Sequence, residues 1–181
     1  MSLVIGICGA SGSGKTSVAN LVKDCFSSCK LIAQDDFYLS DADITAILQG
    51  KINWDCIEAI NIVDLLSHIA DACQEYTLVI VEGHMLTLIT SLVFDTIFYL
   101  EIDESTCKQR RERRIQNGDP DPLYYFEEYV WPCAQKAREA ALLCSPILTK
   151  SNDSITAIVD RVVLHIIEKH KAILKSASTK Q

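Results

Sequence analysis

The sequence predicts an α/β fold in which a five-stranded parallel sheet is covered by helices on both faces. Short, uninterrupted apolar runs such as residues 3–8 and 77–81 are typical of strands that are buried on both faces. These runs alternate with longer segments of helical periodicity, of which residues 60–73 are the clearest. Because no internal repeat or low-complexity linker interrupts this alternation, we expect one domain over residues 1–181.

The expected elements follow one another along the chain. Strands are expected at residues 3–8, 31–33, 77–81, 96–102 and 146–149. Helices are expected from the end of a glycine-rich motif to about residue 27, then at 41–48, 60–73, 104–114 and 124–143. A last helix should start near Asp153, which is a good N-cap residue. Residues 117–122 should form a loop, and Pro132 should either kink its helix or lie near a helix start.

Composition narrows the classes of function. The net charge is −7 and the isoelectric point is near 5.0, so the overall field does not attract nucleic acid or anionic membranes. The eight cysteines include no C-x-x-C pair, which favours reduced thiols in a cytoplasmic protein. The sequence has no basic leader segment and no apolar run of about 20 residues, so we expect neither a signal peptide nor a membrane span. No obligate protein partner is indicated.

A phosphate-binding loop lies between the first expected strand and its helix. It follows the pattern G-x-x-x-x-G-K-T, in which backbone N–H groups and a helix N-terminus converge on phosphates. The lysine would neutralise the β and γ phosphates, and the threonine hydroxyl would reach Mg²⁺. We expect ATP to bind at Gly9, Ala10, Ser11, Gly12, Ser13, Gly14, Lys15, Thr16 and Ser17.

Carboxylates follow the second and third expected strands. Strands of a parallel sheet end at the same crevice as the phosphate loop, so Asp35 and Asp36 are candidates for a general base and an Mg²⁺ contact. Adjacent side chains diverge, and we predict that Asp35 faces the reaction; the alternative is a solvated, Asp-rich turn. Glu82 would contact Mg²⁺ through water or bind the substrate sugar, unless it is only a carboxylate at a strand end.

A basic segment suggests a lid over the phosphates. Within the expected helix 104–114, five cations fall in seven residues: Lys108, Arg110, Arg111, Arg113 and Arg114. A loop that contains glycine and proline follows and could act as a hinge, which predicts an arginine-rich lid over about residues 104–123. The alternative is a solvated basic helix.

An aromatic residue beside a carboxylate suggests the acceptor site. Exposed Trp54 would stack on a ring while Asp55 accepts a hydroxyl hydrogen; alternatively, Trp54 staples the next helix and Asp55 caps it. His84, two residues after Glu82, lies near the predicted crevice and is a candidate for ligand contact. The other three histidines lie in helical patterns and are expected to be surface or core residues.

These motifs, in this order, resemble the nicotinamide riboside kinases, which are members of the uridine kinase-like group of P-loop kinases. The resemblance rests on Gln34-Asp-Asp-Phe37, Trp54-Asp-x-x-Glu-Ala-Ile-Asn61, Val81-Glu-Gly83, Cys107-Lys-x-Arg-Arg111 and Tyr125-Phe-x-x-x-Val-Trp-Pro132. It implies the P-loop kinase fold. The sequence has Trp54 where the family would have Tyr, His84 where it would have Phe, and a recomposed lid loop.

The resemblance also implies roles for residues. Asp35 would be the general base beside Lys15, and Thr16 with Asp35 would form the Mg²⁺ site. Residues implied in ATP binding, besides the phosphate loop, are Arg110, Arg114, Lys150, Ser151 and Asn152. Residues implied in substrate binding are Asp35, Asp36, Phe37, Tyr38, Trp54, Asp55, Glu82 and Arg111.

The implied activity is ATP-dependent phosphorylation of the ribose 5′-hydroxyl of nicotinamide riboside, which gives nicotinamide mononucleotide. Two alternatives remain. A uridine/cytidine kinase would act on another nucleoside with the same machinery. A P-loop nucleotide switch would hydrolyse slowly without an acceptor and would need neither an arginine-rich lid nor an aromatic platform.

Overall fold

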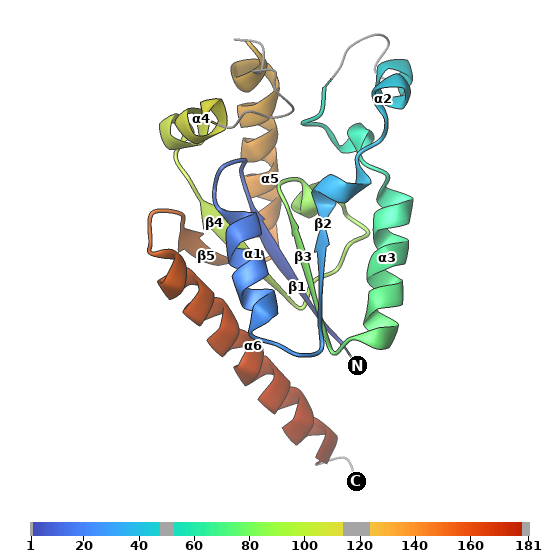
Figure 1. Cartoon of the computed structure of the whole chain (residues 1–181), viewed down its shortest axis with the longest axis vertical. Helices are drawn as coiled ribbons and strands as arrows, with labels where there is room; N and C mark the ends of the chain where they lie inside the picture. The colour runs from blue at the N-terminus through green and yellow to red at the C-terminus, as the bar shows by residue number, and fades with distance from the viewer. Residues whose placement is uncertain (1, 48–52, 114–123, 179–181) are drawn as a thin grey trace.

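The computed structural model describes residues 2–47, 53–113 and 124–178 (Figure 1). Within them the five expected strands form one parallel sheet in the order β2-β3-β1-β4-β5. The strands are β1 (Leu3–Gly9), β2 (Cys29–Ala33), β3 (Leu78–Gly83), β4 (Thr96–Glu101) and β5 (Ile147–Lys150). The predicted five-stranded parallel sheet is therefore confirmed, with strand ends shifted by one or a few residues.

Helices cover both faces of the sheet. On one face lie α1 (Lys15–Asp24) and α6 (Ile155–Ser178), and on the other lie α3 (Ile62–Glu75) and α5 (Trp131–Leu143). Alternate residues of β3 divide between the two layers: Leu78 and Ile80 pack with the α1 and α6 side chains, and Val79 and Val81 with the α3 side. Both sides of β3 are buried, which explains its continuous apolar run.

Two further helices lie above the carboxyl ends of the strands. These are α2 (Asp41–Ile47) and α4 (Glu104–Glu112), which lie on opposite sides at the top of Figure 1. The Asp103 carboxylate caps α4 by accepting from the Thr106 N–H group at 2.8 Å. The first and last described residues lie at the opposite edge of the sheet (Figure 1). None of the helices in the described residues is long and apolar enough to cross a membrane.

One helix start differs from expectation, and the placement of Pro132 near a helix start agrees with it. The last helix is capped by Ser154, whose hydroxyl accepts from the Ala157 N–H group at 3.2 Å, and the prediction of Asp153 as the cap is wrong. The Asp153 N–H group instead donates to the Lys150 carbonyl at 3.0 Å and closes the turn after β5. Pro132 is the second residue of α5, after a π-helical segment, Phe126–Val130. The π-helical segment leads directly into α5, and Pro132, which has no backbone N–H group, lies in the first turn of that helix.

Candidate active site

The phosphate loop requires glycine at particular positions. Gly9 has φ 147°, and a side chain there would place its Cβ 2.5 Å from the Leu100 carbonyl oxygen of β4. Gly14 has φ 95° and is the N-cap of α1, so the chain turns directly from the loop into the helix. The loop therefore lies close against β4 and points the first N–H groups of α1 into the crevice, as the sequence motif predicts.

Lys15 and Thr16 begin α1 and face the end of β3. The Lys15 ammonium donates to the Ala10 carbonyl at 3.1 Å across the loop, and the Thr16 hydroxyl donates to Glu82 Oε1 at 2.9 Å. Burial raises the pKa of Glu82, while Lys15 and the Thr16 hydroxyl act in the opposite direction. Lys15, the predicted phosphate-binding residue, therefore lies beside Thr16 and Glu82, which are predicted to contact Mg²⁺.

Asp35 lies close enough to Glu82 for its charge to act on that carboxylate. Asp35 and Asp36 lie in a 3₁₀ turn, Gln34–Phe37, and both are exposed. The charge of Asp35 adds to the raised pKa of Glu82, which places Asp35 on the crevice side of the turn. Hard oxygen donors from Thr16, Asp35 and Glu82 suit Mg²⁺. Within the described residues no group of three or more His, Cys, Asp or Glu side chains could hold a metal by itself, so nucleotide phosphates would complete such a site.

Helix α4 lies over the phosphate loop and contacts it through two arginines. Arg110 Nη1 donates to the Gly12 carbonyl at 3.0 Å, and Arg111 Nη1 donates to Ser11 Oγ at 3.3 Å. Gly12 has φ 74°, and a Cβ there would lie 3.1 Å from Arg110 Cβ, so glycine permits this close packing. Of the predicted lid, Lys108 instead pairs with Glu127, away from the loop. Arg114 and the lid residues 114–123 lie outside the described residues.

Asp55 is a buried anion between the sheet and α4. Its residue is 6% exposed; Oδ1 lies 3.2 Å from His84 Nε2, and Oδ2 lies 3.6 Å from Arg111 Nη2. Burial alone would raise the pKa of Asp55, but His84, Arg111 and the Tyr125 hydroxyl together hold it below its usual range. The carboxylate is therefore ionised beside the phosphate loop, as an acceptor for hydroxyl hydrogens requires.

Aromatic rings border this carboxylate. The Trp54 ring meets the Tyr38 ring edge-on with centroids 5.7 Å apart. The backbone N–H group of Trp54 donates to the Tyr125 hydroxyl at 2.7 Å. The guanidinium of Arg111 lies 5.7 Å from the Tyr125 ring centroid. Trp54 is half-buried rather than exposed as predicted, since it packs against the apolar cluster beneath α4. Asn61, and not Asp55, caps α3, so the alternative of Asp55 as a helix cap is wrong.

Phe37 is not brought to the acceptor residues. Its side chain is buried in the core on the α3 side and meets the His68 ring edge-on, with centroids 5.1 Å apart. Its backbone carbonyl accepts from the Asn61 N–H group at 2.8 Å, which holds the 3₁₀ turn against the start of α3. Phe37 therefore packs in the core and holds the 3₁₀ turn that carries Asp35 and Asp36 against α3.

The predicted base-contact segment lies at the far end of the crevice. Lys150 ends β5, and Ser151 and Asn152 lie in the turn that follows. The Ser151 N–H group donates to the Glu101 carbonyl of β4 at 2.8 Å. The Ser151 hydroxyl is buried without a hydrogen-bond partner among the described residues. The turn shares the carboxyl edge of the sheet with the phosphate loop, which suits a nucleotide laid along that edge.

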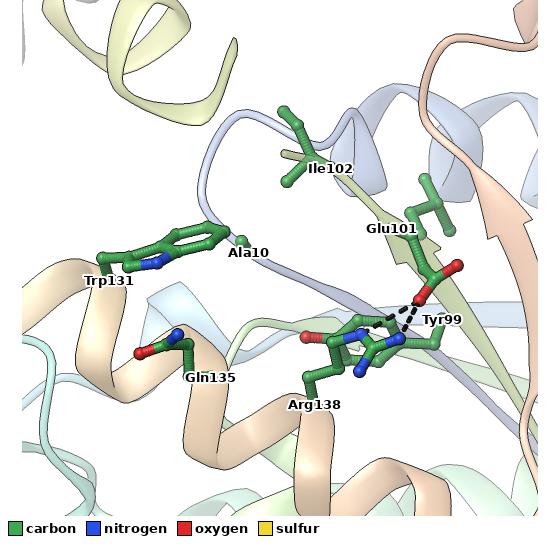
Figure 2. A pocket seen from close by; sticks show the side chains of 8 residues that line it. Ala10, Tyr99, Glu101, Ile102, Trp131, Gln135 and Arg138 are labelled. Carbon is green, nitrogen blue, oxygen red and sulfur yellow. Dashed lines mark hydrogen bonds and ion pairs between the residues drawn. The ribbon is translucent and has the colours of Figure 1, made fainter. Parts of the chain in front are cut away.

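A small pocket of about 40 Å³ opens behind the phosphate loop, between the first turns of α5 and the end of β4 (Figure 2). Trp131 and Ala10 line one part of it, and the ion pair of Arg138 with Glu101, at 2.5 Å, lines another. Of the predicted site residues, Ala10 reaches this space. The pocket is separate from the residues around Asp55, because none of them lines it. This Asp55 cluster consists of Gln34, Trp54, Asp55, His84, Arg111 and Tyr125.

Sequence reasoning missed two residues of the Asp55 cluster as functional candidates. Tyr125 was quoted only as part of a motif, yet its hydroxyl contacts both Trp54 and Asp55. Gln34 is completely buried, and its side chain contacts His84 and the Met85 backbone. In the sequence, Gln34 directly follows the apolar run of residues 31–33, and a polar residue at the end of a buried strand is the signal that could have marked it.

This arrangement defines a class of protein. A phosphate loop on a parallel sheet, with carboxylates at neighbouring strand ends and arginines above the loop, is the construction of the P-loop kinases. The chain belongs to the family described as AAA domain, whose model matches residues 5–128. It is also similar in structure to a gluconokinase from Sinorhizobium meliloti, with a TM-score of 0.60 at 15% identity over 96% of this chain and 97% of that one.

Curated relatives share more of the sequence. Nicotinamide riboside kinase 1 of Homo sapiens is 29% identical over 155 residues, which are 76% of this chain and 77% of that protein. Nicotinamide riboside kinase of Schizosaccharomyces pombe is 29% identical over 177 residues, with 72% and 76% covered. A uridine kinase of Listeria innocua is 46% identical over 70 residues, which are 38% and 34% of the two chains. The predicted resemblance to nicotinamide riboside kinases is confirmed.

Proposed function

We propose that this protein is an ATP-dependent kinase that phosphorylates the ribose 5′-hydroxyl of nicotinamide riboside to give nicotinamide mononucleotide. The observation that carries the proposal is Asp55, a buried carboxylate kept ionised beside the phosphate loop and between aromatic residues. The relatives named nicotinamide riboside kinase, from two organisms and over about three-quarters of the chain, support the choice of substrate. Its cytoplasmic location is part of the proposal.

The transfer assigns a role to each residue of the crevice. Asp35 takes the proton of the 5′-hydroxyl, the hydroxyl oxygen forms a bond to the γ phosphorus, and the bond to the β-phosphate oxygen breaks to release ADP. Lys15, Arg110 and Arg111 offset charge on the transferring phosphoryl group. Thr16 and Asp35 would hold Mg²⁺, with Glu82 beside them; the ion would supply positive charge to the phosphate oxygens.

The acceptor carries a positive charge, and the site suits it. A pyridinium ring over an aromatic face gains roughly 0.5–2 kcal/mol, and tryptophan is the best side chain for this contact. Trp54 and the Asp55 anion therefore favour a cationic nucleoside over a neutral one. Arg110, Lys150, Ser151 and Asn152 bind ATP in this proposal, and residues 104–123 act as the lid.

A second candidate is a uridine/cytidine kinase, which the 70-residue match to the Listeria enzyme favours. The deciding experiment measures acceptor-dependent ADP release over a panel of nicotinamide riboside, uridine and cytidine, with the product identified by mass spectrometry. We expect kcat/KM for nicotinamide riboside to exceed that for uridine by at least about tenfold, or roughly 1.4 kcal/mol. Equal use of uridine would contradict the nicotinamide assignment, and ATP hydrolysis that no acceptor stimulates would favour a nucleotide switch.

A further inference from the structure

His84 occupies the centre of the acceptor site without a role in the transfer described above. It follows the end of β3, its side chain is 11% exposed, and it lies between Gln34 and Asp55. We infer that His84 is a positioning residue that carries its hydrogen on Nε2 and thereby fixes the Asp55 carboxylate for the acceptor. The inference rests on the proposed function, in that Asp55 is the group that binds the acceptor.

The hydrogen on His84 is assigned by Gln34. The Met85 N–H group donates to Gln34 Oε1 at 2.9 Å, which fixes the orientation of this completely buried amide. The amide NH₂ group therefore faces His84 Nδ1, at 3.4 Å. Two donors cannot share a hydrogen bond, so Nδ1 is the acceptor and the ring hydrogen is on Nε2. That nitrogen lies 3.2 Å from Asp55 Oδ1, which is an ion-pair distance, although the contact lacks hydrogen-bond geometry among the described residues.

Gly83 allows Gln34 to reach this place. A Cβ on Gly83 would lie 2.6 Å from both Cβ and Oε1 of Gln34, and both are atoms of a side chain with no room to move. The glycine between Glu82 and His84 is thus required by close packing. It places the amide against the sheet, the amide orients the imidazole, and the imidazole orients the carboxylate.

Holding Asp55 in this way keeps it from pairing fully with the arginine above it. Asp55 Oδ2 lies 3.6 Å from Arg111 Nη2, while Arg111 Nη1 donates to Ser11 Oγ of the phosphate loop at 3.3 Å. With Oδ1 directed to His84, the carboxylate keeps lone pairs for an acceptor hydroxyl and Arg111 keeps its contact with the loop. A carboxylate released from His84 would turn toward the guanidinium and bind the acceptor less well.

Kinetics of two substitutions at one position test this role. His84→Phe keeps a flat ring but has no donor, and His84→Gln places an amide NH₂ near the former Nε2. We expect His84→Phe to raise the acceptor KM by about tenfold, because the polar contact with the charged Asp55 carboxylate is lost, with the ATP KM within about twofold. His84→Gln should keep the acceptor KM within about threefold. An unchanged KM in His84→Phe, or equal losses in both variants, would overturn the inference.

The matched control is His68→Phe. His68 also lies beside a carboxylate, with Nδ1 3.2 Å from Asp64 Oδ1, but it is exposed on α3. This variant should leave both KM values unchanged. A rise in the acceptor KM similar to that of His84→Phe would show that loss of any such histidine contact suffices and would overturn the inference.

A spectroscopic measurement separates this inference from the proposed function. In ¹⁵N-labelled enzyme without acceptor, the His84 resonances, assigned by their loss in His84→Gln, should show the Nε2–H tautomer. Asp55→Asn should shift the Nε2 resonance, because it changes the group in contact with that nitrogen. An Nδ1–H pattern, or no shift in Asp55→Asn, would overturn the inference whatever the acceptor is. The Nε2–H pattern in an enzyme that leaves nicotinamide riboside unphosphorylated would count against the proposed function alone.

Discussion

In the proposed site, nine consecutive residues, 9–17, form the nucleotide half, whereas the acceptor half brings together residues from four separate segments: Asp55, His84, Arg111 and Tyr125. The first half relies on backbone N–H groups and glycine conformations, and its Lys15 contacts a loop carbonyl. The second half relies on a buried charge held by three side chains. One half is built by local chain geometry, and the other by tertiary packing.

This difference predicts how each half responds to substitution. Loss of a phosphate-binding side chain removes charge stabilisation from every turnover and leaves the core intact. Loss of an acceptor-side contact changes affinity and selectivity, because its effect depends on which acceptor is bound. Substitutions in the two halves should therefore differ in whether turnover or selectivity is affected most.

The largest expected effect is at the phosphate lysine. Lys15→Ala should abolish turnover, because it removes the ammonium that would neutralise the β and γ phosphates, a charge that Arg110 and Arg111 only supplement from α4. Its circular dichroism spectrum should match the native one, since Lys15 lies outside the core. Lys23→Ala, on the exposed last turn of α1, is the matched control and should keep native turnover. A Lys15→Ala enzyme with near-native activity would break the nucleotide half of the comparison.

The next effect is at the catalytic carboxylate. Asp35→Asn should lower kcat by a factor on the order of 10²–10⁴, the usual range for a lost general base, while ATP binding is largely kept. Asp36→Asn should do less, because it is the charge of Asp35 that acts on Glu82 in the crevice. Steady-state kinetics and ATP titration of both variants give the comparison. If Asp36→Asn were inactive and Asp35→Asn tolerant, the assignment of the base would be reversed.

A smaller effect is expected on selectivity. Trp54→Ala should remove most of the roughly tenfold preference for nicotinamide riboside over uridine, and Trp54→Phe only part of it. The ratio of the two kcat/KM values is the measurement, because it cancels any general loss of activity. A preference that survives Trp54→Ala would assign the selectivity to other groups of the acceptor half.

The smallest effect concerns stability and pH at the junction of the two halves. Burial raises the pKa of Glu82 above its unfolded value, so the unfolded chain loses this proton at lower pH than the folded one does. Glu82 therefore stabilises the fold less and less as pH rises from about 4 through its folded pKa. Glu82→Gln should raise the Tm near pH 7 relative to the native protein, with the difference vanishing near pH 4, while lowering kcat. A lower Tm in Glu82→Gln at neutral pH would contradict the raised pKa.

The two halves also differ in how far the sequence predicts them. The phosphate loop and the five strands follow from a contiguous motif and from apolar runs, and both are confirmed. The contact of Gln34 with His84 joins residues 50 positions apart, and that of Trp54 with Tyr125 joins residues 71 apart. No local pattern encodes such pairs, because register and helix docking decide which side chains meet. The residues alone made Asp55 and His84 candidates, and the resemblance added the acceptor role of Arg111, whereas the roles of Gln34 and Tyr125 as their partners appear only in the tertiary structure.

The chain begins and ends its described course on the far side of the sheet from the crevice. Ser2 is held there by bonds from its hydroxyl to the Cys73 and Tyr76 carbonyls, and the last turns of α6 extend past the strands at the same edge (Figure 1). A label attached at Ser2 or on the last described turn of α6 would therefore lie on the far side of the sheet from the crevice and would leave the nucleotide and acceptor residues accessible.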